Sequence, residues 1–331
     1  MTTSVFYFFP LITAPLFVFM VTLSLIWWLI KGNTLKILDR PNSRSLHTTP
    51  VSRTGGLGML PGILISWVLL PAALPLPAWI GVSLLAAVSF ADDVLTLPVW
   101  WRLLTHSVVA AWFAAVLLAD AHGWLIATVA TVAIVWMINL YNFMDGSDGL
   151  AGGMTLIGFG YYGLAAWLVG NETFAMLNFC IVAAAAAFLL FNFHPARIFM
   201  GDVGAIPLGF LAASFGILGW TNGLWTLWLP LLVFSPFIAD ASVTLAKRCL
   251  RREKIWQAHR EHYYQRLVQS GFGHHNTALL GYVLMLAAGA SAVLVARQDS
   301  IIQLGVGIAW CGVYLAMMLA FDSQGRRRNS G

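Results

Sequence analysis

The stretch NLYNFMDGSDG at residues 139–149 decides how this chain is interpreted, and it follows the unbroken apolar run WLIATVATVAIVWMI at 124–138. It places two carboxylates, two asparagines and two glycines at the end of a membrane-length segment. A charge near the hydrocarbon of a bilayer is costly unless it is paired, hydrated or used in function. The pattern therefore predicts a functional site at the end of a membrane-spanning helix.

The composition is that of an integral membrane protein. Of the 331 residues, 60% are hydrophobic and only 9% are charged, whereas soluble domains carry about 25% charged residues. The three cysteines, at positions 180, 249 and 311, lack the spacing of a disulfide or a metal site, so we expect them to be small buried side chains. The first apolar run has no basic start and no small-residue cleavage site, which favours a retained helix over a signal peptide.

Apolar segments long enough to cross a bilayer, about 20 residues each, recur along the whole chain. They predict an all-α polytopic membrane protein with a single domain, 1–331, and about eleven transmembrane helices. The expected spans are 5–30, 54–73, 78–96, 103–119, 124–143, 153–169, 174–191, 203–219, 225–244, 277–296 and 300–321.

The basic residues fall almost entirely in one set of the loops that these spans define. Of the 18 lysines and arginines, 17 lie in this set, and only Arg297 lies in the opposite one. By the positive-inside rule the basic set is cytoplasmic, which places the N-terminus in the periplasm and the C-terminus in the cytoplasm. The basic loops are 31–53, 97–102, 144–152, 192–202 and 245–276, together with the C-terminal tail.

Five aspartates lie at or near the helix ends that should face the cytoplasm: Asp92, Asp93, Asp145, Asp148 and Asp202. Mg²⁺ prefers oxygen ligands and is usually held by one or two carboxylates together with substrate phosphates. Glycine-rich helix ends add N–H groups that bind phosphate oxygens. The grouping on one side of the membrane favours a divalent-cation and phosphate site. The alternative is that each acid caps a helix or pairs with a loop arginine.

Three long segments carry a family resemblance: SFADDVLTLP at 89–98, NLYNFMDGSDGLAGG at 139–153 and FNFHPARIFMGDVGAIPLGF at 191–210. They resemble the signature segments of the polyprenyl-phosphate N-acetylhexosamine-1-phosphate transferase superfamily, glycosyltransferase family 4. The segment DRPNSRSLHTTPVSRTGGLGM at 39–59 is similar to the first cytoplasmic loop of that family. The resemblance runs from about residue 39 to 275, in the order of the family.

The last cytoplasmic loop, WQAHREHYYQRLVQSGFGHHN at 256–276, resembles the histidine motif of the branch that initiates O-antigen and lipopolysaccharide synthesis. It lacks the triple-histidine run of the peptidoglycan translocase, which argues against a muramoyl-pentapeptide substrate. The chain also departs from some relatives after Asp93, where an acid or a lysine is replaced by Val94, Leu95 and Thr96. A role for that extra position does not carry over.

The resemblance implies transfer of an N-acetylhexosamine 1-phosphate from a UDP-sugar to undecaprenyl phosphate, with release of UMP. Phosphoryl transfer needs in-line positioning and neutralised charge, so the implied cofactor is Mg²⁺, with Mn²⁺ as an alternative. The expected partners are the lipid phosphate, the UDP-sugar and the bacterial inner membrane, but no nucleic acid. The oligomeric state is left open between a monomer and a homodimer.

Motif matching also assigns the expected chemistry to four aspartates. Asp202 is the leading metal ligand, and Asp145 is the second contact to the metal or the diphosphate. Asp92 or Asp93 would act as the base on the lipid phosphate or, in a two-step scheme, as the nucleophile. The sequence does not separate one-step from two-step transfer.

The expected substrate-binding residues come from several cytoplasmic segments. Phe199 is similar to an aromatic residue that stacks on uracil in relatives, the alternative being a core or lipid-facing side chain. The histidines at 259 and 262 share a helix face with Arg266 and would hold the diphosphate or sugar, while a zinc site there needs further ligands. The set is Asn139, Asn142, Asp148, Asn192, Phe199, His259, Arg260, His262, Arg266, His47 and Arg53.

Other residues and functions stay open. Arg102 is a further phosphate candidate, Asp240 would line the groove or pair with an arginine, and His274 and His275 are expected to be solvated. The main alternative function is a secondary transporter with a carboxylate-lined site. Transporter sites lie near the bilayer midplane in repeated halves, whereas these acids gather at one side and the chain shows no repeat.

Overall fold

The structure is a computed structural model of the chain. It describes residues 3–32, 37–39, 46, 50–70, 74–254, 257 and 259–329, and for 3–12 and 325–329 the description is limited to the backbone. The helices are α1 (Thr3–Gly32), α2 (Gly55–Leu69), α3 (Leu76–Leu95), α4 (Val99–His122), α5 (Trp124–Met144), α6 (Leu150–Leu168), α7 (Glu172–Asn192), α8 (Asp202–Thr221), α9 (Trp228–Val233), α10 (Ser235–Leu250), α11 (Tyr263–Leu267), the π-helical turn η1 (Val268–Phe272), α12 (Gly273–Val295) and α13 (Ser300–Asn329).

The predicted class, an all-α polytopic membrane protein, is confirmed. Within the described residues, eight helices are long and apolar enough to cross a membrane. Apart from the helices there is one small hairpin, in which β1 (Leu38–Asp39) pairs antiparallel with β2 (Val51–Ser52). The number of crossings and their orientation stay predictions.

The predicted span 225–244 is wrong as a continuous helix, because the structure divides it into α9 and α10 at Phe234. The sequence explains the break. Pro236 has no N–H to donate to the carbonyl of Leu232, one turn earlier, and the Ser235 hydroxyl donates to that carbonyl instead, at 2.7 Å. The chain turns here, and α10 carries Asp240 and its basic last turn toward the candidate site.

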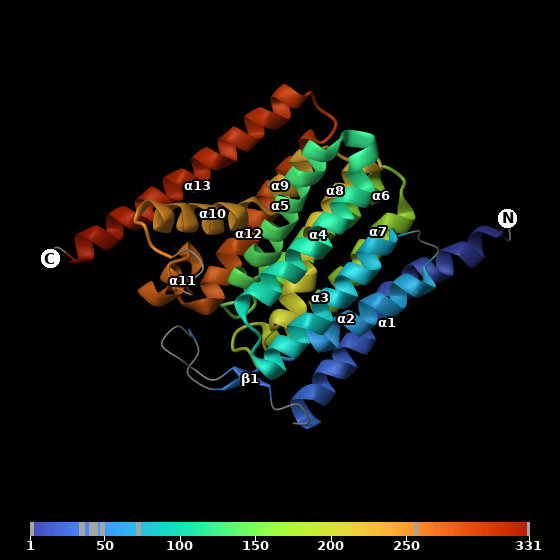
Figure 1. Cartoon of the computed structure of the whole chain (residues 1–331), viewed down its shortest axis with the longest axis horizontal. Helices are drawn as coiled ribbons and strands as arrows, with labels where there is room; N and C mark the ends of the chain where they lie inside the picture. The colour runs from blue at the N-terminus through green and yellow to red at the C-terminus, as the bar shows by residue number, and fades with distance from the viewer. Residues whose placement is uncertain are drawn as a thin grey trace.

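Short connections make consecutive helices from α2 to α8 run in alternating directions, and pairs such as α4 and α5 or α6 and α7 lie side by side. Helices α3, α5 and α7 therefore end at the same face of the bundle where α2, α4, α6 and α8 begin. Figure 1 shows strand β1 at this face, which we call the charged end. All five aspartates singled out in the sequence lie on the segments that meet there.

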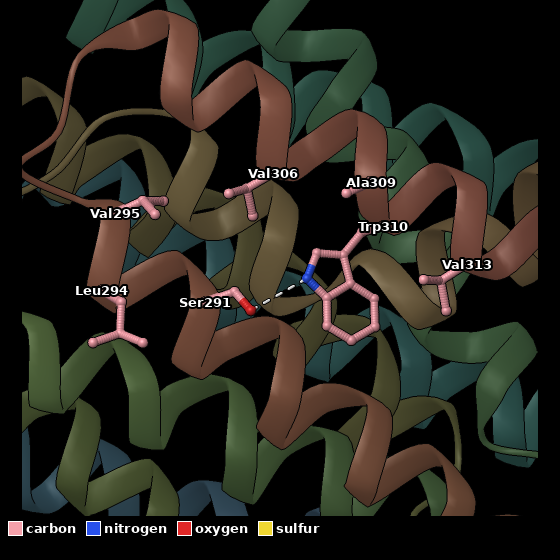
Figure 2. A pocket seen from close by; sticks show the side chains of 7 residues that line it. All are labelled: Ser291, Leu294, Val295, Val306, Ala309, Trp310 and Val313. Carbon is pink, nitrogen blue, oxygen red and sulfur yellow. Dashed lines mark hydrogen bonds between the residues drawn. The ribbon is translucent and has the colours of Figure 1, made fainter.

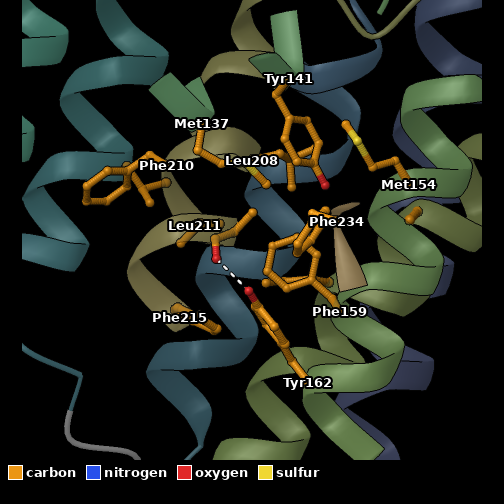
Figure 3. Packing of buried hydrophobic residues seen from close by; sticks show 14 of the residues in the cluster. Met137, Tyr141, Met154, Phe159, Tyr162, Leu208, Phe210, Leu211, Phe215 and Phe234 are labelled. Atoms are coloured by element: carbon orange, nitrogen blue, oxygen red, sulfur yellow. Dashed lines mark hydrogen bonds between the residues drawn. The ribbon is translucent and has the colours of Figure 1, made fainter. Parts of the chain in front are cut away.

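The core is centred on α8, most of whose side chains are buried between α3, α5 and α2. Figure 3 shows aromatic rings gathered beside it: Phe159 and Tyr162 of α6, Tyr141 of α5, and Phe234 at the break between α9 and α10. The Tyr162 hydroxyl donates to the Ala212 carbonyl at 3.0 Å, so a buried polar group is satisfied inside the apolar bundle. Burial on all sides fixes the position of Asp202, the first residue of α8.

The outer surface of the bundle is apolar, as expected for a protein surrounded by lipid. Helix α13 lies along the edge of the bundle, and only 11% of its most apolar stretch is buried against the other helices. One expectation fails here. Cys180 is buried as predicted, but Cys249 and Cys311 are exposed. Small apolar side chains are compatible with a lipid-facing surface, so burial inside the protein is not required of them.

Candidate functional site

The centre of the charged end is a cluster of three aspartates bridged by two arginines. Arg102 of α4 pairs with Asp92 at 3.0 Å and with Asp202 at 3.3 Å. Arg53, just before α2, pairs with the other oxygen of Asp202 at 3.2 Å and lies 3.9 Å from Asp93. Residues far apart in the sequence are therefore joined into one network of charges.

Asn142 and Asp145, both from the stretch at the end of α5, complete this network. In the amide orientation that satisfies both groups, the Asn142 nitrogen donates to Asp202 Oδ1 at 3.2 Å and its oxygen accepts from Arg102 at 3.3 Å. The Asp145 carboxylate accepts the N–H of Gly201 at 3.1 Å. This hydrogen bond holds the Asp145 carboxylate against Gly201, the residue that directly precedes Asp202 in the sequence.

Backbone pairing between residues 52–56 and 198–200 brings Arg53 to Asp202. Ser52 accepts the N–H of Phe199 at 2.7 Å, and Gly55 donates to the carbonyl of the same phenylalanine at 2.9 Å. The first turns of α2 and α8 touch at their backbones, because a Cβ atom on Gly56 would lie 2.2 Å from the Gly204 nitrogen. Only glycine permits this approach.

The electrostatics of the cluster centre on Arg53. Burial alone would lower the pKa of its guanidinium, but the carboxylates of Asp202, Asp93, Asp39 and Asp145 outweigh burial, and the pKa is raised. Burial raises the pKa of Asp145 well above its ordinary range, with Arg53 opposing and Asp202 adding to the effect. These carboxylates thus lie close enough to interact, as a phosphate and cation site requires.

The two adjacent aspartates of α3 have different surroundings. Asp92 Oδ1 accepts the N–H of Leu97 at 2.7 Å, and its other oxygen pairs with Arg102. The Asp93 side chain is only 4% exposed, and its Oδ2 has no hydrogen-bond partner among the described residues. A buried carboxylate oxygen without a donor is costly, so the two adjacent carboxylates differ in how well their surroundings satisfy them.

Asp148 is tied into a second cluster with two histidines. Its Oδ2 bonds His194 Nδ1 at 2.7 Å and accepts the N–H of Ala196 at 3.1 Å. The ring of His274 stacks on that of His194, with centroids 5.5 Å apart, and its Nδ1 bonds the Ser147 hydroxyl at 2.9 Å. His274 was expected to be solvated, and this was wrong, because it joins the start of α12 to the turn after α5.

The side-chain amides of Asn139 and Asn192 form hydrogen bonds with backbone groups of this chain. Asn192 is buried, accepts the N–H of Gly149 at 3.0 Å and donates to the Ile198 carbonyl at 2.9 Å. Asn139 donates to the Val135 carbonyl of its own helix at 2.7 Å. Phe199 is half-buried beside the cluster. Substrate contacts by these residues and by Asp148 stay predictions.

The histidine segment docks on the end of α5. The Tyr264 hydroxyl donates to the Phe143 carbonyl at 2.7 Å, and the buried His262 stacks on the Phe143 ring with centroids 5.6 Å apart. Asp240 of α10 accepts the N–H groups of Tyr263 and Tyr264 at 2.8 and 2.9 Å. Asp240 therefore holds the start of α11 and does not line a groove.

His259 lies beside this docked segment and is neutral near pH 7. Burial, followed by the nearby His262 and Arg248, lowers the pKa of its imidazole to about 4. The two histidine rings lie 4.8 Å apart. His259 is therefore a neutral hydrogen-bond donor or acceptor at this pH, and its contact with the diphosphate or sugar stays a prediction.

Arg266 and Arg260, two further basic residues of the predicted set, form no ion pair with the three aspartates of the cluster in the described part of the chain. Arg266 pairs with Asp322 of α13 at 2.8 Å and stacks over the Tyr263 ring, so it fixes α11 to the C-terminal helix. Arg260 is exposed. His47 lies outside the described residues.

The donor set fits a magnesium ion only in a limited sense. Among the described residues, no group of three or more His, Cys, Asp or Glu side chains is arranged to hold a metal ion, and this includes the zinc alternative at the histidine segment. Mg²⁺ bound with substrate phosphates needs only one or two carboxylates. Asp202 and Asp145 supply two carboxylates, and the hydrogen bond from the Gly201 N–H to Asp145 keeps them near each other.

Arg102, His194, His274 and Tyr264 are the residues that sequence reasoning underrated or left unassigned. A basic residue soon after an aspartate pair was a usable signal for Arg102. The other three have no local signal, because their partners are more than 40 residues away in the sequence.

An apolar pocket of about 370 Å³ lies between α12 and α13, where the Trp310 indole donates to the Ser291 hydroxyl at 3.3 Å (Figure 2). Its other lining side chains are aliphatic. It contains no carboxylate or basic group, so it does not belong to the candidate site.

The fold and this geometry define a polytopic membrane protein whose charged groups meet at one end of a helix bundle. Residues 76–220, which include α3 to α8, match the family model described as glycosyl transferase family 4. The chain is 26% identical over 303 residues to the "Probable undecaprenyl-phosphate N-acetylglucosaminyl 1-phosphate transferase" of Bacillus subtilis (strain 168), covering 86% of this chain and 84% of the relative.

Two further relatives have similar names. The "Decaprenyl-phosphate N-acetylglucosaminephosphotransferase" of Mycobacterium leprae (strain TN) is 28% identical over 319 residues, covering 80% of this chain and 79% of the relative. The "Phospho-N-acetylmuramoyl-pentapeptide-transferase" of Levilactobacillus brevis is 39% identical over 119 residues, covering 35% and 36%. Through residues 76–220 the chain carries a glycosyl transferase family 4 region, and over most of its length it is similar to proteins named for transfer of N-acetylglucosamine phosphate to a polyprenyl phosphate.

Proposed function

We propose that the protein transfers an N-acetylhexosamine 1-phosphate from a UDP-sugar to undecaprenyl phosphate at the cytoplasmic face of the bacterial inner membrane. An oxygen of the lipid phosphate attacks the β-phosphorus of the UDP-sugar, the bond between this phosphorus and the bridging oxygen breaks, and UMP leaves. The product, an undecaprenyl diphosphate sugar, would initiate O-antigen or another envelope polysaccharide.

The observation that carries the proposal is the joining of Asp92, Asp93 and Asp202 by Arg53 and Arg102 at one end of the bundle. Phosphoryl transfer depends on positioning and on groups that neutralise developing charge. Carboxylates for a cation and guanidiniums for phosphate oxygens supply both. A transporter site near the middle of the bilayer has less support, because the described charges gather at the helix ends.

In this proposal Asp202 and Asp145 hold Mg²⁺ or Mn²⁺, which would neutralise charge on the transferred phosphate when bound. Asp93 accepts the proton of the lipid phosphate, because its buried Oδ2 has no donor within the described part of the chain. Asp148 and Asn192 hold the turn after α5 against the segment that carries Phe199.

The sugar is an N-acetylhexosamine in this proposal because both relatives that match over most of the chain are named for N-acetylglucosamine phosphate transfer. The muramoyl-pentapeptide relative given above matches over about a third of the chain. GlcNAc is therefore the first candidate, followed by GalNAc, FucNAc and QuiNAc.

The test is release of UMP by the purified protein with undecaprenyl phosphate and each of these UDP-sugars. We expect release that requires Mg²⁺ or Mn²⁺ and the lipid phosphate, and that is lost in Asp202→Ala. The matched control is Asp120→Ala, which removes an exposed aspartate at the opposite end of α4. Equal activity in the two variants, or release without the lipid phosphate, would refute the proposal.

A further inference from the structure

Asp202, the expected metal ligand, already has most of its hydrogen-bonding capacity in use. Its Oδ1 faces Arg53 at 3.2 Å and the Asn142 amide nitrogen at 3.2 Å, and its Oδ2 faces Arg102 at 3.3 Å. A carboxylate offers about four lone-pair positions. Two neighbouring guanidiniums also repel a dication, so Asp202 in this arrangement is a poor ligand for a free metal ion.

The two arginines each hold a second carboxylate as well. Arg102 bonds Asp92 at 3.0 Å, and Arg53 lies 3.9 Å from Asp93. The side chains of Arg53 and Arg102 are 35% and 27% exposed, whereas that of Asp202 is only 8% exposed. The guanidiniums therefore form the accessible layer of the cluster, and the carboxylate lies beneath them.

We infer that Arg53 and Arg102 form an exchangeable clamp, which holds Asp202 until a nucleoside diphosphate draws the guanidiniums onto its phosphates and frees the carboxylate for the metal ion. This inference rests on the proposed function. Guanidinium groups bind phosphate oxygens in the same bidentate manner as carboxylates, so the exchange replaces one strong contact by another. Metal and nucleotide binding are then positively coupled, and the coupling passes through Arg102.

The coupling is measured by Mn²⁺ binding to the purified protein, detected as loss of the free Mn²⁺ electron paramagnetic resonance signal. Each protein is titrated with Mn²⁺ alone and with Mn²⁺ plus UDP, and the Mn²⁺–UDP complex in solution is subtracted. No lipid acceptor is present and no turnover occurs. The measurement is therefore separate from the transferase reaction, and failure of the inference is distinguished from failure of the proposed function.

We expect Arg102→Gln to bind Mn²⁺ alone at least about tenfold more tightly than the unsubstituted protein, because one guanidinium has left Asp202. UDP should strengthen Mn²⁺ binding to the unsubstituted protein, and this gain should disappear in Arg102→Gln. Arg102→Lys should tighten Mn²⁺ binding by only a few-fold. Lysine keeps the positive charge but lacks the two guanidinium nitrogens with which Arg102 bridges Asp92 and Asp202.

Arg197→Gln is the matched control, because Arg197 is exposed at the same end and bonds the Leu190 carbonyl. Asp202→Asn should bind Mn²⁺ weakly with and without UDP. Unchanged or weaker Mn²⁺ binding in Arg102→Gln would overturn the inference, as would equal tightening in Arg197→Gln. If Arg102→Gln does not fold, Arg102→Lys decides by the same comparison, and no tightening there overturns the inference.

Discussion

At the scale of single residues, the adjacent aspartates Asp92 and Asp93 of α3 lie in different environments. Asp92 is held by the Leu97 N–H and by Arg102, whereas one buried oxygen of Asp93 has no donor among the described residues. Successive helix residues diverge by about 100°, so the two carboxylates face different neighbours. The difference in partners predicts a difference in function.

Asp93→Asn should therefore reduce turnover by about 10² to 10⁴-fold, the range expected for loss of a general base. Asp92→Asn keeps an oxygen for the Leu97 N–H and should cost only about tenfold, through a weaker hold on Arg102. Turnover of both variants at saturating substrates gives the comparison. A larger loss in Asp92→Asn would assign the base to Asp92 instead.

His259 gives a prediction for the pH dependence of stability. Its pKa in the folded protein is lowered to about 4 from an ordinary 6.5, so the unfolded chain binds its proton more readily. The stability contribution is then complete above pH 6.5 and is lost as the pH falls toward 4. Because the ring is partly exposed, the loss should be only about 1 kcal/mol.

The measurement is the midpoint of thermal unfolding in detergent between pH 7 and pH 4, compared for the unsubstituted protein and His259→Gln. The variant should lose less stability on acidification. His275→Gln, which removes an exposed histidine, should follow the unsubstituted protein. Parallel curves for all three proteins would show that His259 is not the group responsible.

The sequence allowed the positions of the aspartates to be predicted, because charges at the ends of apolar runs are conspicuous. It did not show that arginines bridge them, since Arg53, one of the two arginine partners of Asp202, is 149 residues away in the sequence. Asp240 was misjudged for a related reason. A carboxylate inside an apolar segment suggests function, but here it binds two backbone N–H groups of α11.

At the scale of elements, the site depends on how closely the first turns of α2 and α8 approach. Gly56 and Gly204 touch at their backbones, and the adjoining pairing of residues 52–56 with 198–200 sets Arg53 beside Asp202. From the sequence, residues 54–73 were expected only to form a membrane span, and nothing in TGGLG at 54–58 pointed to α8. Only the structure identifies the contact, because its other half lies in a distant segment.

Gly56→Ala should push the two helix starts apart, because the added methyl group would meet backbone atoms that have no alternative rotamer. We expect a loss of about 1–3 kcal/mol in the free energy of unfolding and a lower turnover. Gly160→Ala in α6 is the control, since a Cβ atom there has open space and alanine favours helix. Equal effects of both substitutions, measured by thermal unfolding and UMP release, would argue against the helix contact.

The break between α9 and α10 shows what hydrophobicity alone cannot predict. The segment 225–244 is apolar enough to be counted as one span, and the warnings within it were two prolines, Pro230 and Pro236. Proline is tolerated in membrane helices when a neighbouring hydroxyl satisfies the freed carbonyl, and Ser235 does so here. Whether such a helix continues or turns depends on tertiary packing.

At the scale of the whole molecule, the account requires the charged end to face the cytoplasm. The native cysteine Cys249 is exposed near the end of α10 and next to its basic last turn, so it reports on this side. In a Cys311→Ser background, we expect a membrane-impermeant maleimide to label Cys249 in inside-out vesicles but not in intact cells. Asp299→Cys, in the opposite turn and with both native exposed cysteines replaced, should label from outside. The reverse pattern would invert the orientation.

The central claim is that the sugar moves together with its phosphate onto a lipid phosphate. It is tested most directly with UDP-N-acetylglucosamine labelled with ³²P at the β-phosphate, incubated with the purified protein, undecaprenyl phosphate and Mg²⁺. Transfer of the sugar 1-phosphate carries the label into the organic phase, in an amount equal to the UMP released. Label that stays in the water phase as UDP, or appears there as free phosphate or sugar phosphate, would contradict the claim.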